Sequence, residues 1–131
     1  MIVADTHVII WDALRPELLS RKAKSAILRA NSEDGIMFCE ISLWEIAMLM
    51  KKGRIRVGVG FLEFVNLLRE SNRYVFQGIT PEIAELSSHL SLGQNKDPAD
   101  RIIAATSIIQ NARLITADED LRHSTRVKTI W

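Results

Sequence analysis

Ile2-Val3-Ala4-Asp5 is the stretch that decides the fold, because three apolar residues are followed at once by an acid. A short apolar run of this kind is typical of a strand in a parallel sheet, which is covered on both faces. An ionised carboxylate at the edge of a core is costly unless it is paired, hydrogen-bonded or bound to a cation. The stretch therefore predicts a central strand and a functional edge directly after it.

Other short apolar runs along the chain predict further strands of the same sheet, over residues 36–39, 74–77, 113–116 and 127–130. The segments between them carry helix signals. Polar N-cap residues precede a helical proline at Thr80-Pro81 and Asp97-Pro98. The predicted helices begin or run at residues 20–31, 42–52, 61–70, 80 onward and 98–110. Strands that alternate with helices favour parallel βαβ crossovers. We therefore expect an α/β fold, a three-layer α/β/α sandwich around a mainly parallel central sheet.

The bulk composition bounds the class of protein. A chain of 131 residues with 47% hydrophobic and 25% charged residues fits one compact globular domain over residues 1–131. The net charge of +1 gives no overall attraction to nucleic acid. A single cysteine, Cys39, excludes an intrachain disulfide and fits a reducing compartment. No apolar run approaches the ~20 residues of a membrane span, and no cationic leader precedes the first strand. We expect a cytoplasmic protein without a membrane anchor.

Four acids stand at the edges of predicted core elements. Asp5 and Asp118 directly follow strands, while Glu45 and Asp100 lie in the first turns of helices. The carboxyl ends of parallel strands meet at one edge of the sheet, and right-handed crossovers bring the following helix starts to that edge. No lysine or arginine is obviously set beside them. The four carboxylates are therefore predicted to converge on an oxygen-lined site for Mg²⁺ or Mn²⁺.

Each acid also has a purely structural interpretation. Asp5 could be a turn or cap residue after its strand. Glu45 has the spacing of a capping box with Ser42, although its neighbours Trp44 and Ile46 indicate a largely buried turn where function is favoured. Asp118 could be a simple turn residue, but the hydroxyl of Thr116 offers it an orienting hydrogen bond.

Asp97 and Asp100 compete for one role. With Pro98 at the first helical position, Asp97 is the expected N-cap and its oxygens are taken by backbone N–H groups. Asp100 lies in the first turn with its oxygens free for a metal. Both acids also gain from the positive helix end, so structural stabilisation stays open as an explanation.

Zinc is disfavoured, because no two of His7, Cys39, His89 and His123 have zinc-ligand spacing. A receiver-type phosphoacceptor domain, which also binds Mg²⁺, would need paired acids after the first strand and a lysine at a late strand end. A phosphatase of the haloacid dehalogenase type would need a second Asp where His7 stands. In this chain the first strand is followed only by Asp5, and Thr116 is followed by Ala117 and Asp118, so neither pattern is present.

Taken together, these residues resemble the PIN domain, and within it the VapC-like ribonuclease toxins of toxin–antitoxin pairs. The resemblance covers nearly the whole chain and rests on motifs in a fixed order, Val3-Ala4-Asp5-Thr6-His7, Ile41-Ser42-Leu43-Trp44-Glu45-Ile46, Asp97-Pro98-Ala99-Asp100-Arg101, Leu114-Ile115-Thr116-Ala117-Asp118 and Val127-Lys128-Thr129-Ile130-Trp131. Any one motif is weak, whereas their order in a chain of this length is fairly specific.

The resemblance implies a metal-dependent endoribonuclease in which Asp5, Glu45, Asp100 and Asp118 bind Mg²⁺ or Mn²⁺, supported by Thr6 and Thr116. It implies an RNA substrate, a homodimer and a small cognate antitoxin that blocks the site. All four carboxylates are expected to be ionised near neutral pH. A binding protein that kept the fold and lost turnover stays open, since a ligand set does not guarantee activity.

One position departs from the family's pattern. Many similar relatives carry a histidine two residues before the Asp-Pro motif, where this chain has Asn95. A proton-transfer or RNA role at that position is therefore in doubt. The predicted early helices carry more large apolar side chains than one core obviously needs. These side chains either pack in the core or form a surface for an antitoxin. These residues are Trp11, Trp44, Met48, Leu49 and Met50.

Overall fold

The computed structural model describes all residues, 1–131, and forms a five-stranded sheet with the order β3-β2-β1-β4-β5. The strands are β1 (Ile2–Ala4), β2 (Ile36–Cys39), β3 (Tyr74–Gln77), β4 (Arg113–Ile115) and β5 (Thr129–Ile130). Every neighbouring pair is parallel, and β1 lies at the centre as its sequence predicts. The strand order reverses between β1 and β4, and such a switch point opens a crevice at the carboxyl ends of the strands.

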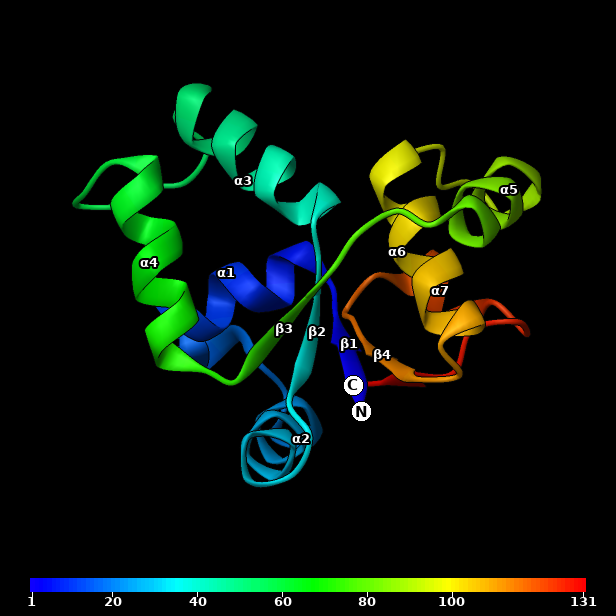
Figure 1. The fold of residues 1–131 in the computed structure, drawn as a ribbon, viewed down its shortest axis with the longest axis horizontal. Coiled ribbons are helices and arrows are strands. Elements are labelled where there is room, and N and C mark those ends of the chain that lie inside the picture. The colour runs from blue at the N-terminus through cyan, green and yellow to red at the C-terminus, as the bar shows by residue number, and fades with distance from the viewer.

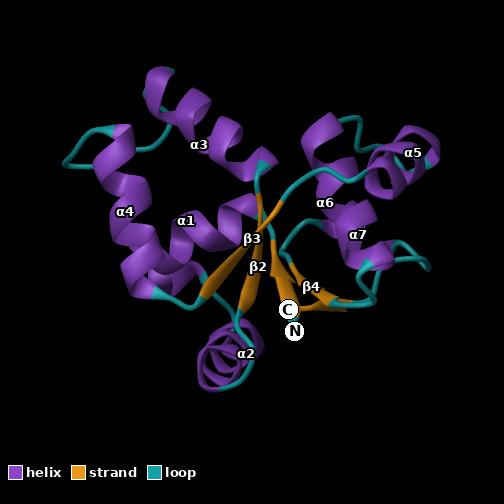
Figure 2. Cartoon of the chain, viewed as in Figure 1, coloured by secondary structure: helices purple, strands orange, loops and turns teal.

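Helices cover both faces of this sheet. They are α1 (Thr6–Leu14), a 3₁₀ turn η1 (Pro16–Leu18), α2 (Arg21–Ser32), α3 (Ile41–Lys51), α4 (Phe61–Ser71), α5 (Pro81–His89), α6 (Pro98–Ile109) and α7 (Glu119–His123). Figure 1 shows α1 to α4 on one side of the strands and α5 to α7 on the other. Figure 2 shows the strands as a separate central layer between them. The predicted three-layer α/β/α architecture is confirmed.

The strands alternate between two cores. Val3, Met37 and Leu114 pack with residues of α6 and α7, whereas their successors Ala4, Phe38 and Ile115 pack with residues of α1 to α4. All six are at most 6% exposed. Because successive side chains of a strand point to opposite faces, β1, β2 and β4 each contribute to both cores. This explains why their buried residues are consecutive and do not alternate with polar ones.

Two helices had no clear signal in the sequence. α1 begins directly after β1, and its residues Val8, Ile9 and Ile10 are all buried, so no amphipathic period marks it. α7 spans only Glu119–His123, a short charged segment without a hydrophobic period that would predict a helix. The last strand is also shorter than expected, because only Thr129–Ile130 pair with β4 within the predicted 127–130.

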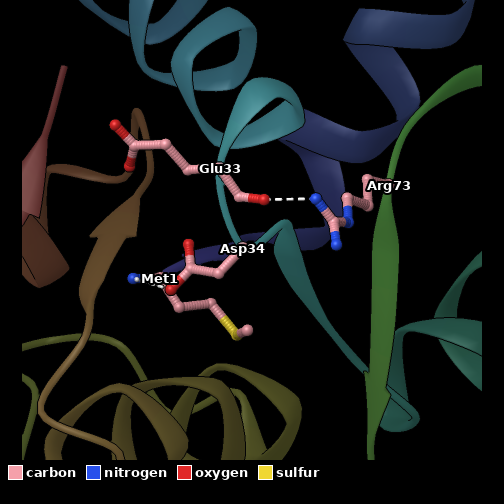
Figure 3. A network of polar contacts seen from close by, with 4 residues as sticks. All are labelled: Met1, Glu33, Asp34 and Arg73. Atoms are coloured by element: carbon pink, nitrogen blue, oxygen red, sulfur yellow. Dashed lines mark hydrogen bonds and ion pairs between the residues drawn. The ribbon is translucent and has the colours of Figure 1, made fainter.

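The turn between α2 and β2 is fixed at the edge of the sheet opposite the strand carboxyl ends. Gly35 has φ +94°, and a Cβ there would lie 2.5 Å from the carbonyl oxygen of Arg73. Figure 3 shows the guanidinium of Arg73 donating to the carbonyl of Glu33, while the Met1 amino group lies 3.1 Å from Asp34. These contacts tie β1, β2 and the start of β3 together at one end, which leaves the opposite end to the acids.

None of the helices has the length and apolar character needed to cross a bilayer.

Candidate functional site

The four predicted acids line one cavity at the carboxyl ends of the strands. The cavity has a volume of about 280 Å³, and no lysine or arginine lines it. Its lining residues are Asp5, His7, Trp11, Glu45, Asp97, Asp100, Ala117 and Asp118. The predicted convergence of acids from four separate parts of the chain is therefore what the fold produces.

Asp5 is the most firmly held of the four acids. Its side chain is 5% exposed. One carboxylate oxygen accepts from the backbone N–H of Thr6, and the other accepts from the hydroxyl of Thr116, both at 2.7 Å. Burial raises the pKa of Asp5 against the lowering effect of these donors and of His7. Two short hydrogen bonds fix the carboxylate at the end of β1, the central strand.

Thr116 does not orient the Asp118 carboxylate, contrary to the prediction. Its hydroxyl donates to Asp5 and accepts from the backbone N–H of Asp118 at 3.1 Å. The Asp118 carboxylate instead accepts from the backbone N–H of Leu121 at 3.0 Å, as the N-cap of α7. Thr116 therefore joins two acids of the cavity, one through its side chain and one through the backbone.

Glu45 is held by Thr6, and the capping box that competed with a functional role for this residue does not form. α3 begins one residue earlier than predicted, after Glu40, which makes no side-chain cap. The hydroxyl of Thr6 donates to a carboxylate oxygen of Glu45 and lies 2.7 Å from the hydroxyl oxygen of Ser42. Thr6 has one hydroxyl proton, so Ser42 must donate to Thr6 while Thr6 donates to Glu45. The Ser–Thr–Glu relay crosses from α1 to α3.

The surroundings of Glu45 are mixed. Ile46 is fully buried as expected, but Trp44 is 61% exposed, so the turn is not buried on both sides. Burial is the main cause that raises the pKa of Glu45, and the charges of Asp97 and Asp5 raise it further. The hydrogen bond from Thr6 lowers it. A positive charge in the cavity would therefore stabilise the ionised form of Glu45.

Asn95 bridges the remaining two acids. Its amide nitrogen lies 2.7 Å from a carboxylate oxygen of Asp100 and 3.4 Å from one of Asp118. Its carbonyl oxygen accepts from the backbone N–H of Asp97 at 2.8 Å, which fixes the direction of the amide. A carboxamide does not titrate near neutral pH. The position that departs from the family's pattern therefore holds two acids in place and cannot transfer a proton.

Burial raises the pKa of Asp100 to about 7, and the nearby charges of Asp5, Asp97 and Glu45 add to the effect. The hydrogen bond from Asn95 opposes it. The expectation that all four carboxylates are fully ionised at neutral pH is therefore wrong for the cavity without a cation. The raised pKa of Asp100 could not be predicted from the local sequence, because its burial and the charges of Asp5 and Glu45 depend on segments far away in the chain.

Asp97 is the N-cap of α6, as predicted. One carboxylate oxygen accepts from the backbone N–H of Ala99 at 2.9 Å, and Pro98 occupies the first helical position. The side chain is exposed, although it reaches the rim of the cavity. Asp100 lies in the first turn of the helix and is only partly exposed. The two acids of this segment thus have different surroundings.

We expect Asp97→Ala to lower the free energy of unfolding by roughly 0.5–2 kcal/mol, because it removes a side-chain N-cap. Most of any cleavage activity should survive at a temperature where the variant stays folded. Chemical denaturation and RNA cleavage on the same preparation check both parts. An inactive but folded Asp97→Ala protein would show that Asp97 belongs with the essential acids.

The donor set fits a hard divalent cation, although no three His, Cys, Asp or Glu side chains are arranged for direct coordination. Each of the four acids has at least one oxygen engaged by a neighbouring donor. Carboxylate oxygens are the ligands that Mg²⁺ and Mn²⁺ prefer. Burial is the main cause that raises the pKa values of Asp5, Glu45 and Asp100, and the charges of neighbouring acids raise them further. A bound cation would offset both effects.

Sequence reasoning missed three residues of the site. Asn95 was treated only as a departure from a pattern, and Ser42 as a cap. Trp11 was assigned to apolar packing, yet it lines the acid cavity. The signal that could have found Trp11 is its four-residue spacing from His7, which places both side chains on one face of α1.

Comparisons with known proteins agree with this geometry. The model of the PIN domain matches residues 2–126. Ribonuclease VapC22 of Mycobacterium tuberculosis is 36% identical over 132 residues, covering 99% of this chain and 98% of the relative.

Two solved structures share the fold. A toxin–antitoxin complex from Klebsiella pneumoniae is 22% identical, with a TM-score of 0.65 over 97% of this chain and 95% of that one. FitAcB from Neisseria gonorrhoeae is 20% identical, with a TM-score of 0.69 over 98% and 96%. The chain belongs to the PIN domain family.

Proposed function

We propose that this chain is a metal-dependent endoribonuclease and the toxin of a toxin–antitoxin pair. The observation that carries the proposal is the single cavity lined by Asp5, Glu45, Asp100 and Asp118 without any lysine or arginine. The 36% identity to a protein named as a ribonuclease supports an RNA substrate. Residues 1–131 would act as one PIN-like domain.

Asp5, Glu45, Asp100 and Asp118 would hold Mg²⁺ or Mn²⁺. When bound, such an ion activates water, polarises the phosphodiester and stabilises the leaving oxygen. Asp5 is fixed by Thr6 and Thr116, so it would set the position of the site. Thr6 holds Glu45 from one side and Asn95 holds Asp100 and Asp118 from the other. These residues keep the carboxylates directed at one small volume, in which the ion would bind.

A small antitoxin and a second copy of the chain are the proposed protein partners. Trp44 is the exposed member of the predicted surface, whereas Trp11, Leu49 and Met50 pack against the core beneath α1 to α4. Core packing therefore explains most of that apolar set. Exposed apolar side chains remain on α3 and α4 at Trp44, Leu62 and Leu67, and they offer a surface for a partner. An RNA substrate and the free, buried Cys39 support a cytoplasmic location.

The test is cleavage of RNA with and without metal. We expect cleavage with Mg²⁺ or Mn²⁺, loss of cleavage in EDTA and recovery when excess metal is added. Hydrolysis by water should leave a 5′-phosphate and a 3′-hydroxyl, which end-labelling distinguishes from the cyclic phosphates of metal-independent ribonucleases. Full activity in a chelator would overturn the mechanism. A soluble, folded protein that binds metal and RNA without cleaving would support the alternative of a binding protein.

A further inference from the structure

Three aromatic rings form a row that leads away from the acid cavity. His7 and Trp11 line the cavity itself. The ring centroids of His7 and Trp11 are 5.9 Å apart, and those of Trp11 and Trp131 are 6.0 Å apart. We call His7, Trp11 and Trp131 the aromatic row. It is built from α1 and from the segment after β5, so two distant parts of the chain meet there.

The two tryptophan rings of the row pack against the core on one side and are partly exposed to solvent on the other. Trp11 and Trp131 pack against the core between the sheet and helices α1 to α4, yet both stay partly exposed, and His7 is exposed. The planes within the row are inclined by 56° and 53°, so neighbouring rings do not cover each other's flat faces. Core aromatics behave differently, because Phe38 and Phe76 stack at 4.5 Å with planes inclined by 4°. The aromatic row therefore presents fixed rings with free faces beside the acids.

The position of the row follows from α1. This helix begins at Thr6, directly after Asp5, and Figure 1 shows it leaving the end of β1 where the acids gather. His7 and Trp11 are four residues apart, about 6 Å along the helix axis, and share one face. A nucleic acid bound at this cavity would pass a base over Trp11, because Trp11 lines the cavity beside the acids.

The side chains of the cavity favour contacts to bases over contacts to backbone phosphates. No lysine or arginine lines the cavity, so no such side chain there can bind a phosphate directly. Proteins bind single-stranded nucleic acid by stacking unpaired bases on aromatic side chains, and they do so without needing sequence-specific hydrogen bonds. Paired bases within a duplex have no free face to offer. The geometry therefore selects unpaired nucleotides.

We propose that Trp11, flanked by His7 and Trp131, is a stacking site for a nucleobase of single-stranded RNA next to the scissile phosphate. The inference rests on the proposed ribonuclease function and names the structural class of its substrate. It also assigns Trp11 a binding role that packing alone does not require.

The experiment is a double-mutant cycle between protein and RNA. The probe is a fluorescein-labelled single-stranded oligonucleotide around a site mapped by wild-type cleavage, with a second version that carries an abasic ribose beside the scissile phosphate. Binding is measured on the Asp100→Asn protein, which prevents turnover. Trp11→Ala should weaken binding of the intact oligonucleotide roughly 10- to 100-fold. It should have no further effect on the abasic oligonucleotide.

Controls separate stacking from folding. Trp11→Phe keeps an aromatic ring and should retain most of the affinity, while Trp44→Ala removes an exposed tryptophan outside the cavity and should change nothing. If Trp11→Ala does not fold, two other measurements test the stacking. Trp131→Ala should weaken binding of the intact oligonucleotide, and the protein with an unmutated aromatic row should bind the abasic oligonucleotide more weakly than the intact one. Equal losses on intact and abasic RNA, or none on either, would overturn stacking and leave the nuclease proposal standing. Wild-type protein that neither binds nor cleaves RNA would end both.

Discussion

Asp100→Asn should abolish RNA cleavage, by more than about 100-fold, while the protein stays folded. The substitution removes one anionic ligand at nearly constant shape, and the new amide can still accept the hydrogen bond from Asn95. Loss of residues that only orient metal ligands typically costs 10- to 100-fold, so loss of a ligand should cost at least as much. Cleavage of a defined RNA with saturating Mg²⁺, alongside a thermal melt, measures both properties.

Glu119→Gln is the matched control, because it removes the same charge from an exposed acid next to Asp118. Its cleavage rate should equal that of the wild type. In bacteria, wild-type expression should arrest growth, and Asp100→Asn should be tolerated. Normal cleavage by Asp100→Asn, with loss in Asp97→Ala, would reverse the roles assigned to these two acids. Harmless expression of abundant soluble wild-type protein would contradict the toxin proposal.

The sheet and the meeting of the acids could be predicted because both depend on local signals. Apolar runs mark the strands, and Asp97-Pro98 marks a helix start at the correct residue. In parallel α/β folds the chain order of such elements is enough to bring their carboxyl ends together. Asp5 directly follows β1 and Asp100 lies in the first turn of α6. Glu45 is the fifth residue of α3, and Asp118 is the N-cap of α7.

What the sequence could not provide are the partners of those acids. Thr6 meets Ser42 and Glu45 across 36 and 39 residues, and Asn95 meets Asp118 across 23. Ser42 and Glu45 have the spacing of a capping box, but the tertiary contact with Thr6 prevails because it satisfies buried polar groups on two helices at once. A local pattern is therefore a poor guide where a distant hydroxyl competes for the same side chain.

The stability of the metal-free protein should fall as pH rises, with Asp100 as the principal identified cause. The pKa of Asp100 is about 7 in the folded protein, against its ordinary value of 3.8 in the unfolded chain. Below pH 4 the group is protonated in both states and its effect is absent. Between about pH 4 and pH 7 the folded state binds more protons than the unfolded state, so the free energy of unfolding decreases with pH. Above pH 7 the full cost is present.

Asp100→Asn removes this cost, so the metal-free variant should be more stable than the wild type at pH 8. One unit of pKa corresponds to ~1.4 kcal/mol, and partial solvent contact of the side chain reduces the gain to about 1–3 kcal/mol, or several degrees in Tm. The gain should shrink toward zero near pH 4. Melts of both proteins in EDTA across this pH range provide the measurement.

Mg²⁺ supplies the decisive comparison, because a ligand that binds only the folded state raises its stability. At pH 8 the ion should stabilise the wild type much more than Asp100→Asn, and so narrow or reverse the order seen in EDTA. Asp5 and Glu45 also have raised pKa values, so their repulsion remains in the variant and limits its gain. A variant that melts below the wild type in EDTA at pH 8 would show that the Asp100 carboxylate stabilises the fold through a contact that its amide cannot replace. The acids would then form a structural network and not a site under electrostatic strain.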